Sequence, residues 1–286
     1  MKSLFRCPVC AAGLAQEAHR YICPRGHSYD LSAAGYTHLL PANQKHSKNP
    51  GDDKDMVAAR CAFLDKGYYA PFRDALCDLA VELTSDSPSP ILLDSGCGEG
   101  YYTTALHNAL CSAGRDPAVA GIDISKFALR KAAKKLPQGE FAVASAYHLP
   151  LADGAVHLLT NIFSPLSADE FARVLAPGGH FLYAVPSARH LWQMKQVLYD
   201  APYENPVKRE DYPGFQWLRA VPLRYAVTLD SPEDIRTLFA MTPYAWKTPK
   251  AGVDRLLSLE RLETEIGFDI HVYRRTADAP AKKSPD

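Results

Sequence analysis

The sequence feature that most constrains the fold is a glycine-rich loop, DSGCGEG, at residues 94–100. The loop follows the apolar run 91–94, which we expect to be a strand, and a helix is expected to begin at about Tyr101. Glycines at alternate positions allow positive φ values and let the backbone approach a ligand closely. The N-terminus of the following helix favours a negatively charged group such as a carboxylate. The loop therefore predicts a ligand site at the carboxyl end of a strand.

Strands and helices are expected to alternate after this loop. Hydrophobic periodicity and turn signals predict strands at 91–94, 119–123, 141–144, 156–162 and 180–185, separated by helices that begin at Tyr101 or span 125–136 and 167–175. Such alternation is typical of the α/β class, with a mainly parallel sheet and helices on both faces. Beyond it, SPEDIRTLFA predicts a helix capped by Ser231, and GFDIHVYRR predicts a final strand.

The glycine spacing distinguishes two kinds of nucleotide site. A dinucleotide-binding loop, G-x-G-x-x-G, would need glycine at position 101, where the chain has Tyr101. The alternate-glycine form resembles instead motif I of class I S-adenosylmethionine (SAM)-dependent methyltransferases. Three later segments follow in the order of that class, namely GIDI at 121–124, ASAYHLP at 144–150 and RVLAPGG at 173–179. The resemblance implies a Rossmann-like fold with a seven-stranded, mainly parallel sheet; the alternative is a sheet protein with turn glycines.

A group of cysteines near the N-terminus predicts a metal site. Cys7-x₂-Cys10 and Cys23-x₃-His27 are two knuckles, each containing Cys-Pro, and twelve residues separate them. Thiolates and imidazole are suitable ligands for Zn²⁺, and four of them form a structural tetrahedral site with no open position for water. A metal cross-link also stabilises a segment of this length, because below about 40 residues a domain buries little surface. The alternative is a redox CxxC motif with an unrelated Cys and His.

Charge and composition limit the compartment and the partners. The formal net charge is +0, which argues weakly against nucleic acid, but residues 1–51 carry six basic residues against two acidic ones. Phosphate contacts by this segment would make binding sensitive to salt, and solvated surface charge is the alternative. The candidates are Arg6, Arg20, Arg25, Lys45 and Lys48. No apolar run approaches the ~20 residues that span a bilayer, and seven dispersed cysteines are ordinary in a reduced compartment. We therefore expect a cytoplasmic protein that does not enter a membrane.

The chain divides into two expected domains. Residues 1–40 are predicted to form a small zinc-ribbon domain whose basic charge suits a polyanion, and residues 41–286 the methyltransferase domain. Within the latter, PANQKHSKNPGDD at 41–53 has the composition of a linker or loop, and TADAPAKKSPD at 276–286 that of a disordered tail.

Four segments together resemble one family, the bacterial 23S rRNA (guanine-N1-)-methyltransferases with an N-terminal zinc finger. These segments are CPVC…CPRGH, HSKNPGDDKDMVAAR, LDSGCGEGYYT and MTPYAW, and the resemblance extends from Cys7 to about Arg275. It implies transfer of a methyl group from SAM to N1 of a guanine in a hairpin of 23S rRNA. It also implies that Cys7, Cys10, Cys23 and His27 hold zinc. For the cofactor, the resemblance and the motifs indicate Tyr69, Asp94, Gly96, Gly98, Glu99, Gly100, Asp123 and His190.

The target base is expected beside the loop that follows the fourth strand, NIFSP at 161–165. Phe163 would stack on the guanine and Asn161 would hydrogen-bond it, while Tyr244 and Trp246 either line the same opening or pack the sheet. Plain packing is the alternative for Phe163. Two other functions stay open, a methyltransferase for tRNA or a small molecule and a non-catalytic RNA-binding module. The oligomeric state is open between a monomer and a homodimer.

Overall fold

The computed structural model describes residues 2–41, 50–206 and 210–277. Lys45, Lys48, most of the expected linker at 41–53 and most of the expected tail at 276–286 lie outside these residues.

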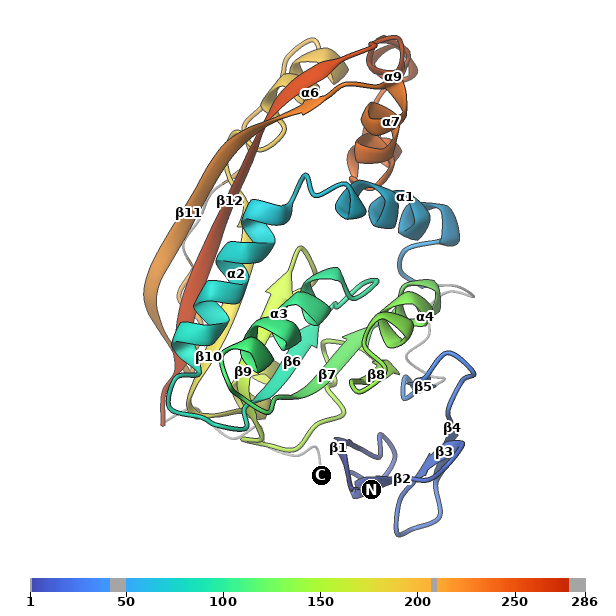
Figure 1. Cartoon of the computed structure of the whole chain (residues 1–286), viewed down its shortest axis with the longest axis vertical. Helices are drawn as coiled ribbons and strands as arrows, with labels where there is room; N and C mark the ends of the chain where they lie inside the picture. Colours follow the sequence, from blue (N-terminus) through green and yellow to red (C-terminus); the bar gives the residue numbers. More distant parts are fainter. Residues whose placement is uncertain (1, 42–49, 207–209, 278–286) are drawn as a thin grey trace.

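An eight-stranded sheet forms the centre of the molecule (Figure 1). Its strand order is β11-β12-β10-β9-β6-β7-β8-β5, and the pairs from β10 to β5 are parallel, whereas β12 pairs antiparallel with both β10 and β11. The α/β class and the mainly parallel sheet are thus confirmed. The strands are β6 (Ile91–Ser95), β7 (Ala118–Asp123), β8 (Glu140–Val143), β9 (Val156–Ile162), β10 (Leu175–Pro186), β11 (Phe215–Leu229), β12 (Leu262–Arg275) and β5 (Tyr36–His38).

Residues 91–275 supply the seven expected strands, β6 to β12, and the N-terminal segment contributes an eighth. Strand β5 pairs in parallel with β8 and covers what would otherwise be an open edge of the sheet. Thr37 and the following Leu39 are buried there, and the Leu39 N–H donates to the Val143 carbonyl at 2.9 Å. Three residues are too few to show a periodic pattern, so the sequence carried no signal for this strand.

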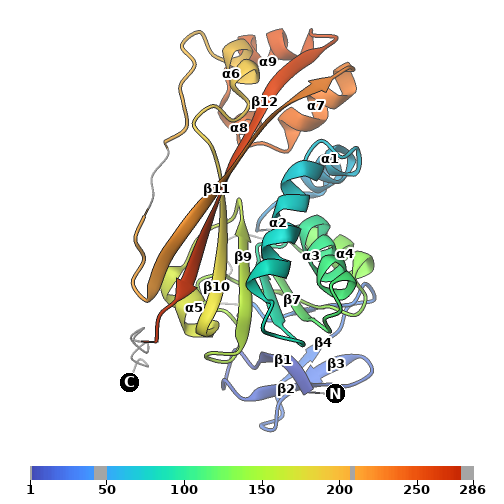
Figure 2. The same ribbon diagram turned by 60° about the vertical axis from the view of Figure 1, so that its left-hand side comes forward.

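Helices cover both faces of the sheet, and Figure 2 shows α2, α3 and α4 on one face and α5 on the other. Their ends follow the sequence signals: Asp53 accepts a hydrogen bond from the Met56 N–H at 2.8 Å at the start of α1, and Ser125 caps α4 in the same way. The bounds are α1 (Lys54–Asp65), α2 (Ala70–Leu83), α3 (Tyr101–Ser112), α4 (Lys126–Lys135) and α5 (Ala168–Val174).

Strands β11 and β12 extend beyond the sheet to a second group of helices (Figure 2). Ser231 caps α7, as expected from the sequence. Helix α1 contacts both α7 and α4 and so joins this group to the helices on the sheet. The helices of the second group are α6 (Trp192–Leu198), α7 (Pro232–Ala240), α8 (Tyr244–Lys247) and α9 (Lys250–Leu257). No helix in the described part of the chain is both long and apolar enough to cross a membrane.

The N-terminal unit is a four-stranded antiparallel sheet of β1 (Lys2–Arg6), β2 (Gly13–Gln16), β3 (Arg20–Ile22) and β4 (Ser28–Asp30). It packs firmly on the large sheet. Phe5 and Tyr21 belong to the same buried cluster as Ile122 and Ala142 of the large sheet. The Arg6 N–H also donates to the Pro150 carbonyl at 2.8 Å. The unit is therefore seated on the sheet through a shared core.

Candidate functional site

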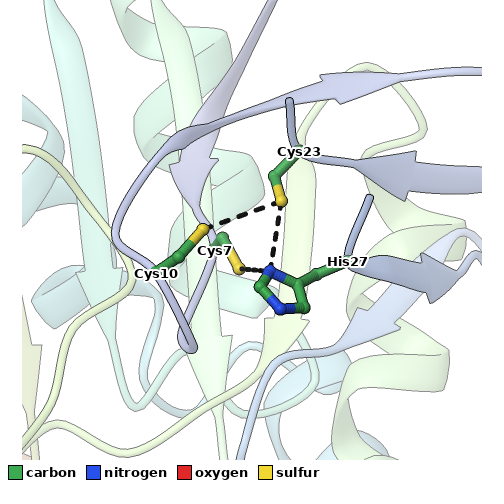
Figure 3. Close-up of side chains that lie close together, drawn as sticks. All are labelled: Cys7, Cys10, Cys23 and His27. Atoms are coloured by element: carbon green, nitrogen blue, oxygen red, sulfur yellow. Dashed lines mark hydrogen bonds between the residues drawn. The ribbon is translucent and has the colours of Figure 1, made fainter. Parts of the chain in front are cut away.

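The four predicted metal ligands converge at one point between the two knuckles (Figure 3). His27 Nδ1 lies 3.5 Å from Cys7 Sγ and 3.3 Å from Cys23 Sγ, and the Sγ atoms of Cys10 and Cys23 are 3.7 Å apart. A zinc tetrahedron with Zn–S of about 2.3 Å and Zn–N of about 2.0 Å has edges of roughly 3.5 to 3.8 Å. The cluster is therefore already spaced for a tetrahedral zinc ion.

Backbone turns bring these ligands together. The Ala11 N–H donates to the Cys7 carbonyl at 2.8 Å and the Gly26 N–H to the Cys23 carbonyl at 2.9 Å. Ala11 and Gly26 both have positive φ, at 56° and 84°, which closes each knuckle tightly. Strands β1 and β3 lead directly into Cys7 and Cys23, so the pairing of the small sheet sets the separation of the knuckles.

The environment of Cys7 favours the thiolate that a metal requires. Burial acts to raise the pKa of Cys7, but hydrogen bonds from the Tyr29 hydroxyl and from backbone N–H groups outweigh it and lower the pKa to about 6. The Tyr29 hydroxyl lies 3.0 Å from Cys7 Sγ. Three thiolates and one imidazole, with no fifth ligand among the residues that the structure describes, suit a structural zinc ion, which these four residues would hold.

A cavity of about 1050 Å³ opens at the carboxyl ends of the central strands. Gly96 follows β6, Asp123 ends β7, Ala144 follows β8 and Ile162 ends β9, and all four line it. This edge, where the direction of the strand crossovers changes, is the usual ligand site of open α/β sheets. Seven of the expected site residues line the cavity: Tyr69, Gly96, Gly98, Glu99, Phe163, Asp123 and His190.

Asp123 connects the glycine loop to the second strand. Its Oδ2 accepts from the Gly98 N–H at 2.9 Å and its Oδ1 from the Ser125 N–H at 2.7 Å. Burial raises the pKa of Asp123 to about 6, against the effect of these two hydrogen bonds. An ionised carboxylate has about four lone-pair sites, so it can still accept from a ligand's hydroxyl groups.

Three expected site residues are placed behind the cavity and do not line it. Asp94 is buried and accepts hydrogen bonds from the hydroxyls of Thr103 and Thr160, and burial raises its pKa to about 6. Asn161 donates through Nδ2 to the Ser95 carbonyl at 3.3 Å and the Pro165 carbonyl at 3.1 Å. These two side chains support the loops that form the wall.

Gly100 is the third expected site residue that does not line the cavity, and it instead lets α3 pack closely against α4. It is the N-cap of α3 with φ of 81°, and a Cβ there would lie 2.8 Å from the Ala132 Cα of α4. Only glycine combines this backbone conformation with so close an approach.

An aromatic group of Tyr69, His190 and Phe268 forms part of the cavity wall. The Tyr69 ring lies 5.1 Å from that of Phe268, and the His190 ring lies 4.6 Å from Phe268. Burial lowers the pKa of His190 to about 3, with a further contribution from Lys195. His190 Nδ1 accepts from the Gly267 N–H at 3.3 Å, so the neutral ring carries its proton on Nε2.

Phe163 and two other aromatic residues lie at the mouth of the cavity. Phe163 is 47% exposed and has φ of 56°, a strained conformation for a bulky residue that is often associated with a functional site. Tyr147 and Trp246 also line the cavity and are 54% and 72% exposed. Tyr244 and Trp246 both line this opening, which is the first of the two alternatives considered for them.

Sequence reasoning missed Arg60 and Asp52, which both line the cavity. They form an ion pair across the start of α1. The segment HSKNPGDDKDMVAAR contributed to the family resemblance, but its helical pattern alone gave no reason to place Arg60 at a ligand site.

Comparison with known proteins finds matches for the N-terminal metal-binding unit and for the large sheet. Residues 5–48 match the family model described as "RlmA, N-terminal", and residues 92–179 match the model described as "Methyltransferase domain". A protein of Bacillus subtilis (strain 168), "Putative 23S rRNA (guanine-N(1)-)-methyltransferase YxjB", is 34% identical over 94% of this chain and 96% of its own.

Two further relatives are also matched over most of their length. A Micromonospora griseorubida protein, "Putative 23S rRNA (guanine-N(1)-)-methyltransferase", is 34% identical over 86% of this chain and 88% of its own. The Streptomyces fradiae "23S rRNA (guanine(748)-N(1))-methyltransferase" is 32% identical over 84% of this chain and 85% of its own. With a zinc ribbon, a methyltransferase domain and relatives matched over nearly their whole length, the chain belongs to the 23S rRNA (guanine-N1-)-methyltransferase family.

Proposed function

We propose that this protein transfers a methyl group from SAM to N1 of a guanine in 23S rRNA. The observation that carries the proposal is the cavity at the carboxyl ends of four parallel strands, where the Gly98 loop and Asp123 meet an exposed aromatic rim. Membership of the family supports the choice of substrate. A substrate in rRNA implies a cytoplasmic location.

SAM, when bound, supplies an electrophilic methyl carbon, so the main task of the protein is to align the acceptor nitrogen with it. In this proposal Asp123 accepts the ribose hydroxyls, and the Gly96–Gly98 turn lets the backbone approach the cofactor. Glu99 contributes charge to the same side of the cavity. Tyr69 and His190 close the opposite side and exclude water.

The target guanine must leave its base stack to reach this cavity. We propose that it stacks on Phe163, whose ring is exposed at the mouth and rests on Phe268 at 4.9 Å. In this proposal Asn161 orients the base through the loop that carries Phe163, which it holds by hydrogen bonds to the Ser95 and Pro165 carbonyls. His190 is a poor candidate for the base that removes the N1 proton, because a group with a pKa of about 3 accepts protons weakly near pH 7.

We propose that residues 1–40 recognise the RNA and that residues 41–286 form the catalytic domain. RNA hairpins are recognised through shape, backbone contacts and unstacked loop bases. Arg6 and Arg25 are exposed on the metal-binding unit, and Arg20 pairs with Glu17 at 2.7 Å where both are half exposed. A surface pair of this kind contributes about 0–1 kcal/mol, so a phosphate can replace Glu17. A 23S rRNA hairpin as the substrate and a homodimer as the assembly are parts of this proposal.

The function is tested by incubating the purified protein with SAM and either 23S rRNA transcripts or a tRNA pool. We expect methyl incorporation into the rRNA alone, a primer-extension stop at one guanine, and a mass shift of that nucleotide that fits N1-methylguanine. Incorporation into tRNA alone, or binding of rRNA without methylation, would overturn the proposal.

Replacing Phe163 by Ala tests the placement of the base. The exposed ring makes no hydrogen bond, so Phe163→Ala should weaken the use of RNA by roughly 5- to 150-fold in kcat/KM, since a base–aromatic stack contributes about 1–3 kcal/mol. The affinity for SAM, measured by calorimetry, should stay within about twofold. Tyr203→Ala is the matched control, because Tyr203 is 52% exposed and is not among the residues that line the cavity. Equal losses in both variants would contradict the assignment.

A further inference from the structure

The described residues that line the cavity contain a single Lys or Arg side chain, that of Arg60. Four carboxylates share the cavity with it, those of Asp52, Asp53, Glu99 and Asp123. The one histidine of the lining, His190, is neutral near pH 7 because its pKa is about 3. The described part of the lining is therefore negatively charged as a whole, and its positive charge lies at one place.

Arg60 lies against the glycine loop. It belongs to α1, two turns after the Asp53 cap, and a Cβ added at Gly98 would lie 3.8 Å from Arg60 Nη1. The side chain is 24% exposed. The guanidinium is thus half-buried beside the backbone that approaches the ligand.

Arg60 remains positively charged in this environment. Burial acts to lower the pKa of Arg60, but the carboxylates of Asp52 and Glu99 outweigh this effect and raise it. The hydrogen bond to Asp52 uses Nη1, and a guanidinium has five N–H donors. Donors therefore remain for a second anionic partner.

This arrangement matches the charges of SAM, which carries a sulfonium, an ammonium and one carboxylate. The two positive groups are suited to a cavity rich in carboxylates. The ligand's carboxylate is instead repelled by four of the five charged side chains in the lining. A buried carboxylate without a partner is costly, and a guanidinium can bind it with two parallel hydrogen bonds.

We propose that Arg60 binds the carboxylate of the methionine portion of SAM and so sets the position of the methyl group along the cavity. The inference rests on the proposed function, since it deepens the cofactor site of that reaction. Asp52 holds the guanidinium in place from the other side, and Asp123 remains free to serve the ribose.

The test compares SAM with decarboxylated SAM, which differs only in lacking the carboxylate. Calorimetry on the full chain with each ligand measures the contribution of that one group. Wild-type protein should bind SAM more tightly than the decarboxylated ligand. In Arg60→Gln, SAM affinity should fall roughly 10- to 100-fold, as expected for the loss of a charged hydrogen-bonded pair, while affinity for decarboxylated SAM changes by less than about threefold.

Two further variants distinguish a specific loss of SAM affinity from a general folding defect. Arg60→Lys keeps the charge but loses the planar fork, so it should give an intermediate loss for SAM alone. Arg73→Gln is the matched control, because Arg73 is a half-buried arginine that pairs with Asp74 and is not among the residues lining the cavity. It should leave both affinities unchanged.

Equal losses for the two ligands in Arg60→Gln would overturn the inference, because Arg60 would then act only through the shape of the site. Unchanged affinity for both would also overturn it. Failure of wild-type protein to bind either ligand would instead refute the proposed function itself, so the two failures are distinguishable.

Discussion

Gly100 lies where helix α3 begins beside α4, and Gly114 follows the last turn of the same helix. Both have left-handed backbone conformations, with φ of 81° and 77°. A Cβ at Gly100 would lie 2.8 Å from the Ala132 Cα and 3.0 Å from its Cβ, whereas a Cβ at Gly114 has nothing within 4 Å. Comparing alanine at Gly100 with alanine at Gly114 therefore separates the energetic cost of the backbone conformation from that of a steric clash.

The magnitudes follow from this difference. Alanine in the left-handed region costs about 1–2 kcal/mol, and both variants incur that cost. Gly100→Ala also forces α3 and α4 apart, since backbone and Cβ atoms cannot rotate away, and overpacking of this kind costs about 1–3 kcal/mol. Gly100→Ala should therefore reduce the free energy of unfolding by about 2–5 kcal/mol, and Gly114→Ala by about 1–2 kcal/mol.

Urea denaturation followed by circular dichroism measures the two losses, with equal slopes required for the comparison. Because the start of α3 carries the Gly98 loop, Gly100→Ala should also weaken SAM binding, whereas Gly114→Ala should not. If the two variants lose the same free energy within about 0.5 kcal/mol, the clash with Ala132 is not the reason for glycine at position 100.

Two other predictions concern protonation and metal. The pKa of His190 is about 3 in the folded state, against an ordinary value of 6.5, so the unfolded state binds more protons between these two pH values. This histidine should therefore reduce the free energy of unfolding by up to about 1.4 kcal/mol per pH unit as the pH falls through that window. Asp94 and Asp123, whose pKa values are raised to about 6, change stability in the opposite direction. The difference between wild type and His190→Gln therefore isolates the contribution of His190. Parallel curves of stability against pH for the two proteins would contradict this contribution. Cys10→Ser should lose the zinc measured by elemental mass spectrometry, and because Phe5 joins the metal unit to the core of the sheet, the chain should melt earlier in one transition; retained zinc would refute the assignment.

Short-range signals made many features predictable from sequence. The cap predicted at Ser231 starts a helix through a hydrogen bond from the N–H three residues ahead, and the structure shows the same bond at Asp53 and Ser125. The spacing of the cysteines and His27 was sufficient for the metal cluster, because each knuckle is a turn of a few residues.

The sequence by itself determined the order of strands and helices after residue 90, the position of the glycine loop and the Cys/His group that could hold a metal, since each depends on neighbours in the chain. Tertiary structure alone decided which of the motif residues face the cavity. Asp94 is engaged by Thr160, which is 66 residues away, and Arg60 reaches the loop at Gly98 from a helix before the sheet. It also decided that β5 extends the sheet and that burial keeps His190 neutral. Such features depend on which distant segments pack together and exclude water, and no local pattern of residues encodes that.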